Sequence, residues 1–114
     1  MSVDYLALEK DYVARSALLA KAGGEPMKAF RALVRSVGGD SALSHKHKEL
    51  IALAIGVAIR CEGCIVFHVR ACIKAGATRD ELVDMLVVAV EMGGGPSSVF
   101  GAQALECFDQ MAAG

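Results

Sequence analysis

The chain has 114 residues, of which 54% are hydrophobic and 5% aromatic, and its 12 basic and 13 acidic residues give a net charge of −1. Such a balance, with no basic run longer than two residues, excludes the electrostatic footprint of a nucleic-acid-binding protein and a polybasic membrane-binding patch. The length fits a single domain over residues 1–114, and without a secretory signal or an apolar run long enough to span a bilayer, we expect a cytoplasmic protein.

Along its whole length, the sequence has the pattern of helices separated by glycine-rich turns. We expect six of them, at about residues 3–21, 26–37, 44–60, 62–75, 79–92 and 96–111. The third contains a stretch, residues 50–55, that is apolar on every face and therefore belongs in a core or a subunit interface. Residues 87–90 have a β-branched, strand-like composition, but the capping box of Thr78 and Glu81 upstream favours a helix. The fold class is all-α.

The chemistry is concentrated at the start of the fourth predicted helix, where Cys61 and Cys64 form a C-x-x-C pair. This spacing brings two sulfurs within reach of a disulfide. A helix N-terminus offers free N–H groups and a partial positive charge, both of which stabilise a thiolate. Because the thiolate is the attacking form of cysteine, the position favours reaction with a peroxide or a disulfide.

His68 follows Cys64 by four residues and so shares its helix face. It can accept the Cys64 proton, which makes Cys64 the predicted nucleophile and Cys61 the resolving cysteine, although the reverse order remains open. If the third and fourth helices form an antiparallel hairpin, Glu49 and His68 differ in axial level by only about 4–5 Å. Glu49 is then within reach of His68 but not of Cys64, which predicts a proton relay from Glu49 through His68 to Cys64.

These four residues reproduce the spacing of the alkyl hydroperoxidase D-like (AhpD-like) branch of the carboxymuconolactone decarboxylase family. Residues 48–54, 75–78 and 92–96 also resemble that family. The resemblance implies a helical homo-oligomer, often a trimer or hexamer, with thiol-dependent peroxidase or disulfide reductase activity. It implies an external dithiol or reductase as electron donor and no cofactor. The chain departs from the best-known peroxidases, which carry a histidine between the cysteines, where this chain has Glu62 and Gly63.

Other interpretations stay open at this point. Cys61, Cys64 and His68 are all possible zinc ligands, with Glu49 as the obvious fourth, but a closed zinc site usually draws on a second knuckle. Decarboxylation of a lactone would use His68 and Glu49 as acid and base with the cysteines incidental, and a redox-sensing scaffold would need no turnover. Cys72 lies on the same stripe as His68, and we expect packing roles for it and for Cys107.

Overall fold

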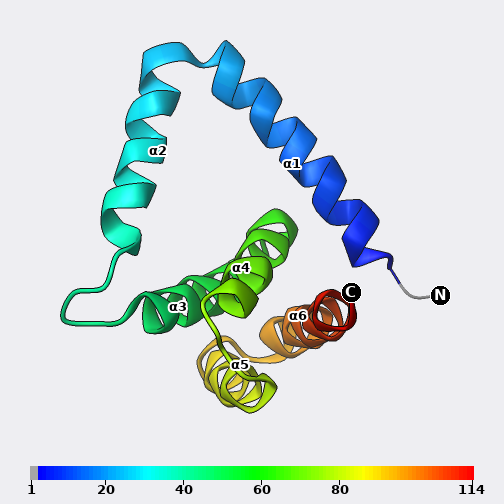
Figure 1. Cartoon of the computed structure of the whole chain (residues 1–114). Helices are drawn as coiled ribbons and strands as arrows, with labels where there is room; N and C mark the ends of the chain where they lie inside the picture. The colour runs from blue at the N-terminus through cyan, green and yellow to red at the C-terminus, as the bar shows by residue number, and fades with distance from the viewer. Residues whose placement is uncertain (1–2) are drawn as a thin grey trace.

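The computed structural model describes residues 3–114, and all of its regular structure is helical (Figure 1). The helices are α1 (Tyr5–Ala22), α2 (Gly24–Gly38), α3 (His45–Ala58), α4 (Glu62–Lys74), α5 (Arg79–Gly93) and α6 (Gly95–Ala113). The predicted all-α fold is therefore confirmed, and residues 87–90 lie inside α5 behind the predicted Thr78–Glu81 capping box. In the described part of the chain, no helix is long and apolar enough to cross a membrane.

Helices α3 to α6 pack around a shared apolar core in which α4 contacts both α3 and α6. The side chains at its centre are fully buried. Burial of each large aliphatic side chain among them stabilises the fold by roughly 1.5–3 kcal/mol. They come from all four helices: Leu53 and Val57 of α3, Ile65, Val66 and Val69 of α4, Leu82 of α5, and Ala104 and Cys107 of α6. This core fixes the orientation of α4, whose first turn carries the cysteine pair.

Helix α1 is attached to the core mainly through its first half. Tyr5 is buried and donates its backbone N–H to the Gln110 side chain at 2.8 Å. Further along α1, the Glu9 carboxylate accepts two hydrogen bonds from the Arg70 guanidinium of α4, at 2.8 and 2.9 Å. Beyond this point α1 diverges from the core and, with α2, forms an arch beside α4 (Figure 1).

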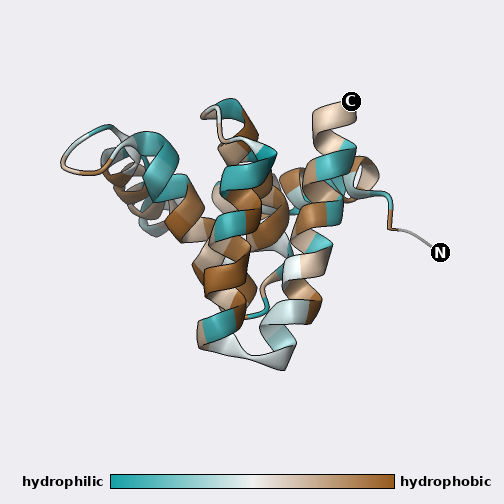
Figure 2. Ribbon diagram, turned by 90° about the horizontal axis from the view of Figure 1, so that it is seen from below, coloured by the Kyte–Doolittle hydropathy of each residue, from teal (hydrophilic) through white to brown (hydrophobic). Residues whose placement is uncertain are grey.

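Helix α2 has no buried residue, although it carries a strongly apolar face. Four large hydrophobic side chains on it are more than half exposed: Phe30, Leu33, Val34 and Val37. The outer faces of α3 and α5 are similarly apolar, and Ile51, Ile55 and Val88 line an open groove of about 530 Å³ between them. Figure 2 shows hydrophobic residues on outward-facing turns of the helices. The stretch at 50–55 thus divides between the core, through Leu50 and Leu53, and the surface.

Candidate functional site

The turn between α3 and α4 fixes the backbone at the first cysteine. Arg60 adopts a left-handed conformation with φ 60°, which is uncommon for a residue with a side chain. In this conformation the Arg60 N–H donates to the Val57 carbonyl at 3.1 Å, and the Cys61 N–H donates to the Gly56 carbonyl at 3.0 Å. These two bonds form a Schellman-type ending of α3. Consequently Cys61 is held against the last turn of α3 and becomes the N-cap of α4.

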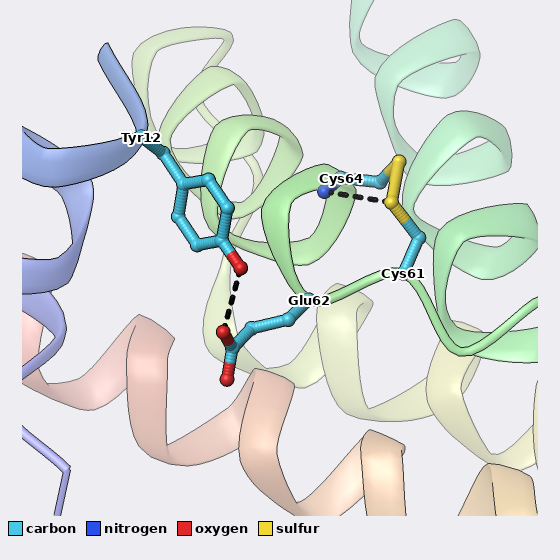
Figure 3. Close-up of a disulfide and its surroundings, with 4 residues drawn as sticks. All are labelled: Tyr12, Cys61, Glu62 and Cys64. Carbon is cyan, nitrogen blue, oxygen red and sulfur yellow. Dashed lines mark hydrogen bonds between the residues drawn. A yellow bond between two sulfur atoms is a disulfide. The ribbon is translucent and has the colours of Figure 1, made fainter. Parts of the chain in front are cut away.

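Cys61 and Cys64 are joined by a disulfide across the first turn of α4, with Cα atoms 5.2 Å apart (Figure 3). The Cys64 backbone N–H donates to the Cys61 sulfur at 3.2 Å. That sulfur therefore takes the capping position usually filled by a serine or aspartate oxygen. The same N–H would stabilise negative charge on Cys61 in the reduced protein.

Gly56 allows α3 to approach the second cysteine closely. A Cβ atom added at Gly56 would lie 3.1 Å from the Cβ of Cys64, closer than carbon atoms pack comfortably. Gly56 is buried, and a side chain there would crowd Cys64 unless one of the two helices shifted slightly. It was not singled out by the sequence, where its only signal is a lone glycine within an apolar helix.

His68 and Glu49 are in direct contact across the α3–α4 pair, as the antiparallel hairpin requires. The Nδ1 atom of His68 and Oε2 of Glu49 are 2.8 Å apart, and the two side chains are 34% and 15% exposed. Because a carboxylate only accepts hydrogen bonds, Nδ1 carries the proton in this pair and Nε2 is left with the lone pair when the ring is neutral. His68 lies four residues after Cys64 in α4, so the two residues share a face of the helix.

The opposite side of the first turn of α4 contacts α1. Tyr12 donates its hydroxyl to the Glu62 carboxylate at 2.6 Å, and its ring lies edge-on to Phe67 with centroids 6.2 Å apart. The hydrogen bond to Glu62 is the main reason that the pKa of Tyr12 is raised. Tyr12 is 50 residues from Glu62 in the chain, and no local sequence pattern pointed to it.

An apolar cavity of about 380 Å³ lies beneath the arch of α1 and α2. Its walls come from Val13 and Leu19 of α1 and from Met27 and Phe30 of α2, and Phe67 of α4 closes it. Phe67 directly precedes His68 in α4. The cavity therefore borders α4 on the side that faces α1 and α2.

The two remaining cysteines are fully buried in the core, as expected for packing residues. Burial raises the pKa of both Cys72 and Cys107 to about 12, with a smaller contribution from Glu49 at Cys72 and from Glu9 at Cys107. Neither thiol is therefore appreciably ionised near neutral pH, and thiolate chemistry is confined to the C-x-x-C pair.

The structure thus brings the four predicted residues to one pair of helices, with Cys61 and Cys64 bonded to each other and Glu49 bonded to His68. Their catalytic roles remain predictions. Across residues 3–114, no group of three or more histidine, cysteine, aspartate or glutamate side chains is arranged to hold a metal ion.

Comparisons with known proteins give the family. The sequence profile of the carboxymuconolactone decarboxylase family matches residues 24–106. An uncharacterized protein of Cupriavidus necator is 36% identical over 93 residues, covering 82% of each chain. An uncharacterized protein from the cox locus of Paracoccus denitrificans is 34% identical over 92 residues, covering 81% of this chain and 83% of the relative.

Two crystal structures are similar over almost the whole chain. One is the apo form of a carboxymuconolactone decarboxylase family protein from Legionella pneumophila, with 43% identity, a TM-score of 0.90, and coverage of 96% of this chain and 97% of that one. The other, from Thermotoga maritima, has a suggested involvement in antioxidative response, with 27% identity, a TM-score of 0.81, and coverage of 90% and 91%. The C-x-x-C pair is consistent with the AhpD-like branch, and the chain belongs to the carboxymuconolactone decarboxylase family.

Proposed function

We propose that the protein is a dithiol–disulfide oxidoreductase that reduces a hydroperoxide or a disulfide, with Cys61 and Cys64 as its redox pair. One observation carries the proposal: a disulfide at the N-terminus of α4, with a histidine one turn further on that is bonded to a carboxylate. A nucleophile, a base and a group that orients the base are the parts that activated thiol chemistry needs.

In the peroxidase cycle, His68 accepts the Cys64 proton at Nε2, and the thiolate attacks the outer oxygen of a hydroperoxide. The O–O bond breaks, Cys64 becomes a sulfenic acid, and the alkoxide takes the proton from His68 and leaves as an alcohol. The Cys61 thiol then attacks the Cys64 sulfur, water leaves, and the disulfide forms. Glu49 keeps the imidazole in the tautomer that this sequence requires.

An external dithiol closes the cycle by reducing the disulfide. Its thiolate attacks the Cys64 sulfur, and Cys61 leaves as a thiolate. The backbone N–H of Cys64, 3.2 Å from the Cys61 sulfur, stabilises this leaving group, and better-stabilised thiolates leave faster. A second attack within the donor releases Cys64 and gives the donor's disulfide. If the substrate is itself a disulfide, the same steps run from the reduced pair toward the substrate.

Two further observations favour this function. The Thermotoga maritima relative has a suggested involvement in antioxidative response. The apolar cavity under the arch of α1 and α2 has a lining that suits a hydrocarbon chain such as that of an alkyl hydroperoxide.

Mass spectrometry after a small dose of an alkyl hydroperoxide tests the proposal. Trypsin releases both cysteines in the peptide 61–70, which should lose about 2 Da as the disulfide forms. Cys61→Ser should stop at a Cys64 sulfenic acid, whereas Cys64→Ser should not react, and Cys72→Ser serves as the matched control with unchanged oxidation. A peptide that stays reduced in the wild type refutes the peroxidase activity, and one that also stays reduced with a small-molecule disulfide refutes the function. Sulfenic acid on Cys61 in the Cys64→Ser variant reverses the order of attack.

We also propose that the protein assembles as a homo-oligomer, because the hydrophobic face of α2 is exposed in the described part of the chain; the family resemblance implies a trimer or hexamer. Light scattering coupled to size-exclusion chromatography measures the assembled mass. Phe30→Glu should reduce that mass, and Lys28→Glu, which introduces the same side chain at an exposed polar position of the helix, should not. An unaltered mass for Phe30→Glu contradicts the role of α2.

A further inference from the structure

The first of the two residues between the cysteines, Glu62, is acidic, yet its charge is directed away from them. Glu62 begins α4, and Figure 3 shows its side chain leaving the first turn toward α1, on the side opposite the disulfide. There its Oε1 atom accepts the hydrogen bond from the Tyr12 hydroxyl at 2.6 Å. Glu62 is exposed, so burial does not restrict this conformation.

Tyr12 is held in place independently of Glu62. Its ring fits against Gly63, where an added Cβ would lie 3.1 Å from a ring carbon. The edge of Phe67 contacts the ring from one side, and the Arg15 guanidinium lies 5.0 Å from its centroid. The hydroxyl is therefore presented at a fixed point on the α1 side of α4.

The position of the carboxylate matters because a negative charge close to a sulfur disfavours the thiolate. The interaction of two charges varies inversely with their separation and is strongest where water is excluded. Without a partner, a glutamate at the first position of α4 has rotamers that bring its charge nearer to the cysteine side of the turn. A tyrosine hydroxyl can retain such a carboxylate only while it stays protonated, and the raised pKa of Tyr12 ensures this across the working range.

We propose that Tyr12 is a positioning residue that holds the Glu62 carboxylate on the α1 side of α4, away from the sulfur pair, so that an acidic residue is tolerated inside the C-x-x-C motif. The proposal rests on the proposed redox function for its importance, but it concerns the ionisation of the reduced cysteines alone.

Other ionisable groups also surround the cysteine pair. On the α1 side they include Tyr5, whose pKa is raised to about 12 by burial and, less strongly, by Glu106 of α6 and Glu62. On the α3 side is Glu49, bonded to His68. Arg15 and Arg60 carry positive charge on the α1 side and beside Cys61. The Tyr12 and Glu62 variants below leave all of these groups in place.

The pH dependence of cysteine alkylation tests the proposal without any substrate. The pre-reduced protein is treated with iodoacetamide at a series of pH values, and the rate is read on the peptide 61–70, which contains both cysteines. Tyr12→Phe should shift the midpoint of this rate up by about 0.3–0.5 pH unit, and Glu62→Gln should shift it down by less, because Tyr12 already holds the carboxylate away from the sulfurs. Tyr5→Phe, the same change elsewhere on α1, should leave it unaltered.

The double variant Tyr12→Phe/Glu62→Gln decides between positioning and packing. Its midpoint should equal that of Glu62→Gln, because the hydroxyl has no carboxylate to hold. The proposal is overturned if a folded Tyr12→Phe protein keeps the wild-type midpoint, or if its upward shift persists in the Glu62→Gln background. Should Tyr12→Phe not fold, Tyr12→Leu removes the same hydroxyl, and a folded Tyr12→Leu protein with the wild-type midpoint refutes the proposal. These outcomes do not depend on peroxide or disulfide turnover, so failure of the proposed function would be seen separately.

Discussion

Two glycines buried inside helices should respond in opposite ways to the same added methyl group. Gly56→Ala in α3 places a Cβ 3.1 Å from the Cβ of Cys64, whereas Gly101→Ala in α6 places one 3.9 Å from the side chains of Leu86 and Val90. The first distance requires α3 and α4 to move apart, and the second is ordinary van der Waals contact. The pair therefore separates the crowding at Cys64 from the general effect of replacing glycine in a helix.

The surroundings of Gly56 and Gly101 set the expected changes in the free energy of unfolding. Replacing glycine by alanine within a helix is worth about 0.5–1 kcal/mol, so Gly101→Ala should raise the free energy of unfolding by roughly that amount. At Gly56 the gain is smaller because the residue lies in the last turn of α3, and overpacking costs about 1–3 kcal/mol. We expect Gly56→Ala to be less stable than Gly101→Ala by about 1–3 kcal/mol.

Urea denaturation followed by circular dichroism at one fixed protein concentration measures this difference, and equal slopes would confirm that only stability changed. The oxidation of the peptide 61–70 in each variant then reports whether displacing α4 disturbs the redox pair. Equal midpoints for the two variants would refute the reasoning, since they would mean that α3 and α4 do not require the close approach at Gly56.

Three other perturbations have defined outcomes. Glu49→Gln should slow turnover at neutral pH by about tenfold or more, because an amide no longer fixes the imidazole tautomer, and an unchanged kcat would remove Glu49 from the relay. Burial raises the pKa of Cys72 and Cys107 from 9.0 to about 12, which favours the neutral thiols in the folded protein. That stabilisation is complete below pH 9.0 and is lost as the pH rises toward 12, so the urea midpoint should fall on going to about pH 11, and should fall less in Cys72→Ala. Glu9→Gln weakens the bidentate pair with Arg70 and should destabilise the attachment of α1 by roughly 1–2 kcal/mol, seen as faster amide exchange in α1 and refuted by unchanged exchange.

The helices were predictable because their signals are local. The capping box at Thr78, the N-cap at Ser44 and the proline at position 96 all act within one turn, and each marks a boundary of the structure to within about two residues. The stretch at 50–55 was harder, because a helix that is apolar on every face does not reveal which side faces its own core. The structure buries Leu53 completely and leaves Ile51 47% exposed, a distinction that depends on the placement of α5.

The candidate site also contains residues that local spacing predicted and residues that it did not. Spacing along one helix placed His68 one turn from Cys64, and counting rise along two helices placed Glu49 beside His68. Tyr12 and Gly56 escaped notice because their importance comes from contacts across helices, which the sequence contains only as the outcome of the whole fold. The left-handed conformation of Arg60 was equally hidden, since glycine is the usual residue there and arginine gives no sign of it.

The sulfur that caps α4 couples the redox state of the cysteine pair to the stability of the helix. A thiolate is a stronger acceptor than a disulfide sulfur, so a Cys61 thiolate formed on reduction should tighten its hydrogen bond with the Cys64 amide and order the N-cap of the helix. Thermodynamic reciprocity then works in the other direction. Any ligand or neighbouring chain that orders this turn will make the oxidised protein easier to reduce, and anything that loosens it will preserve the disulfide.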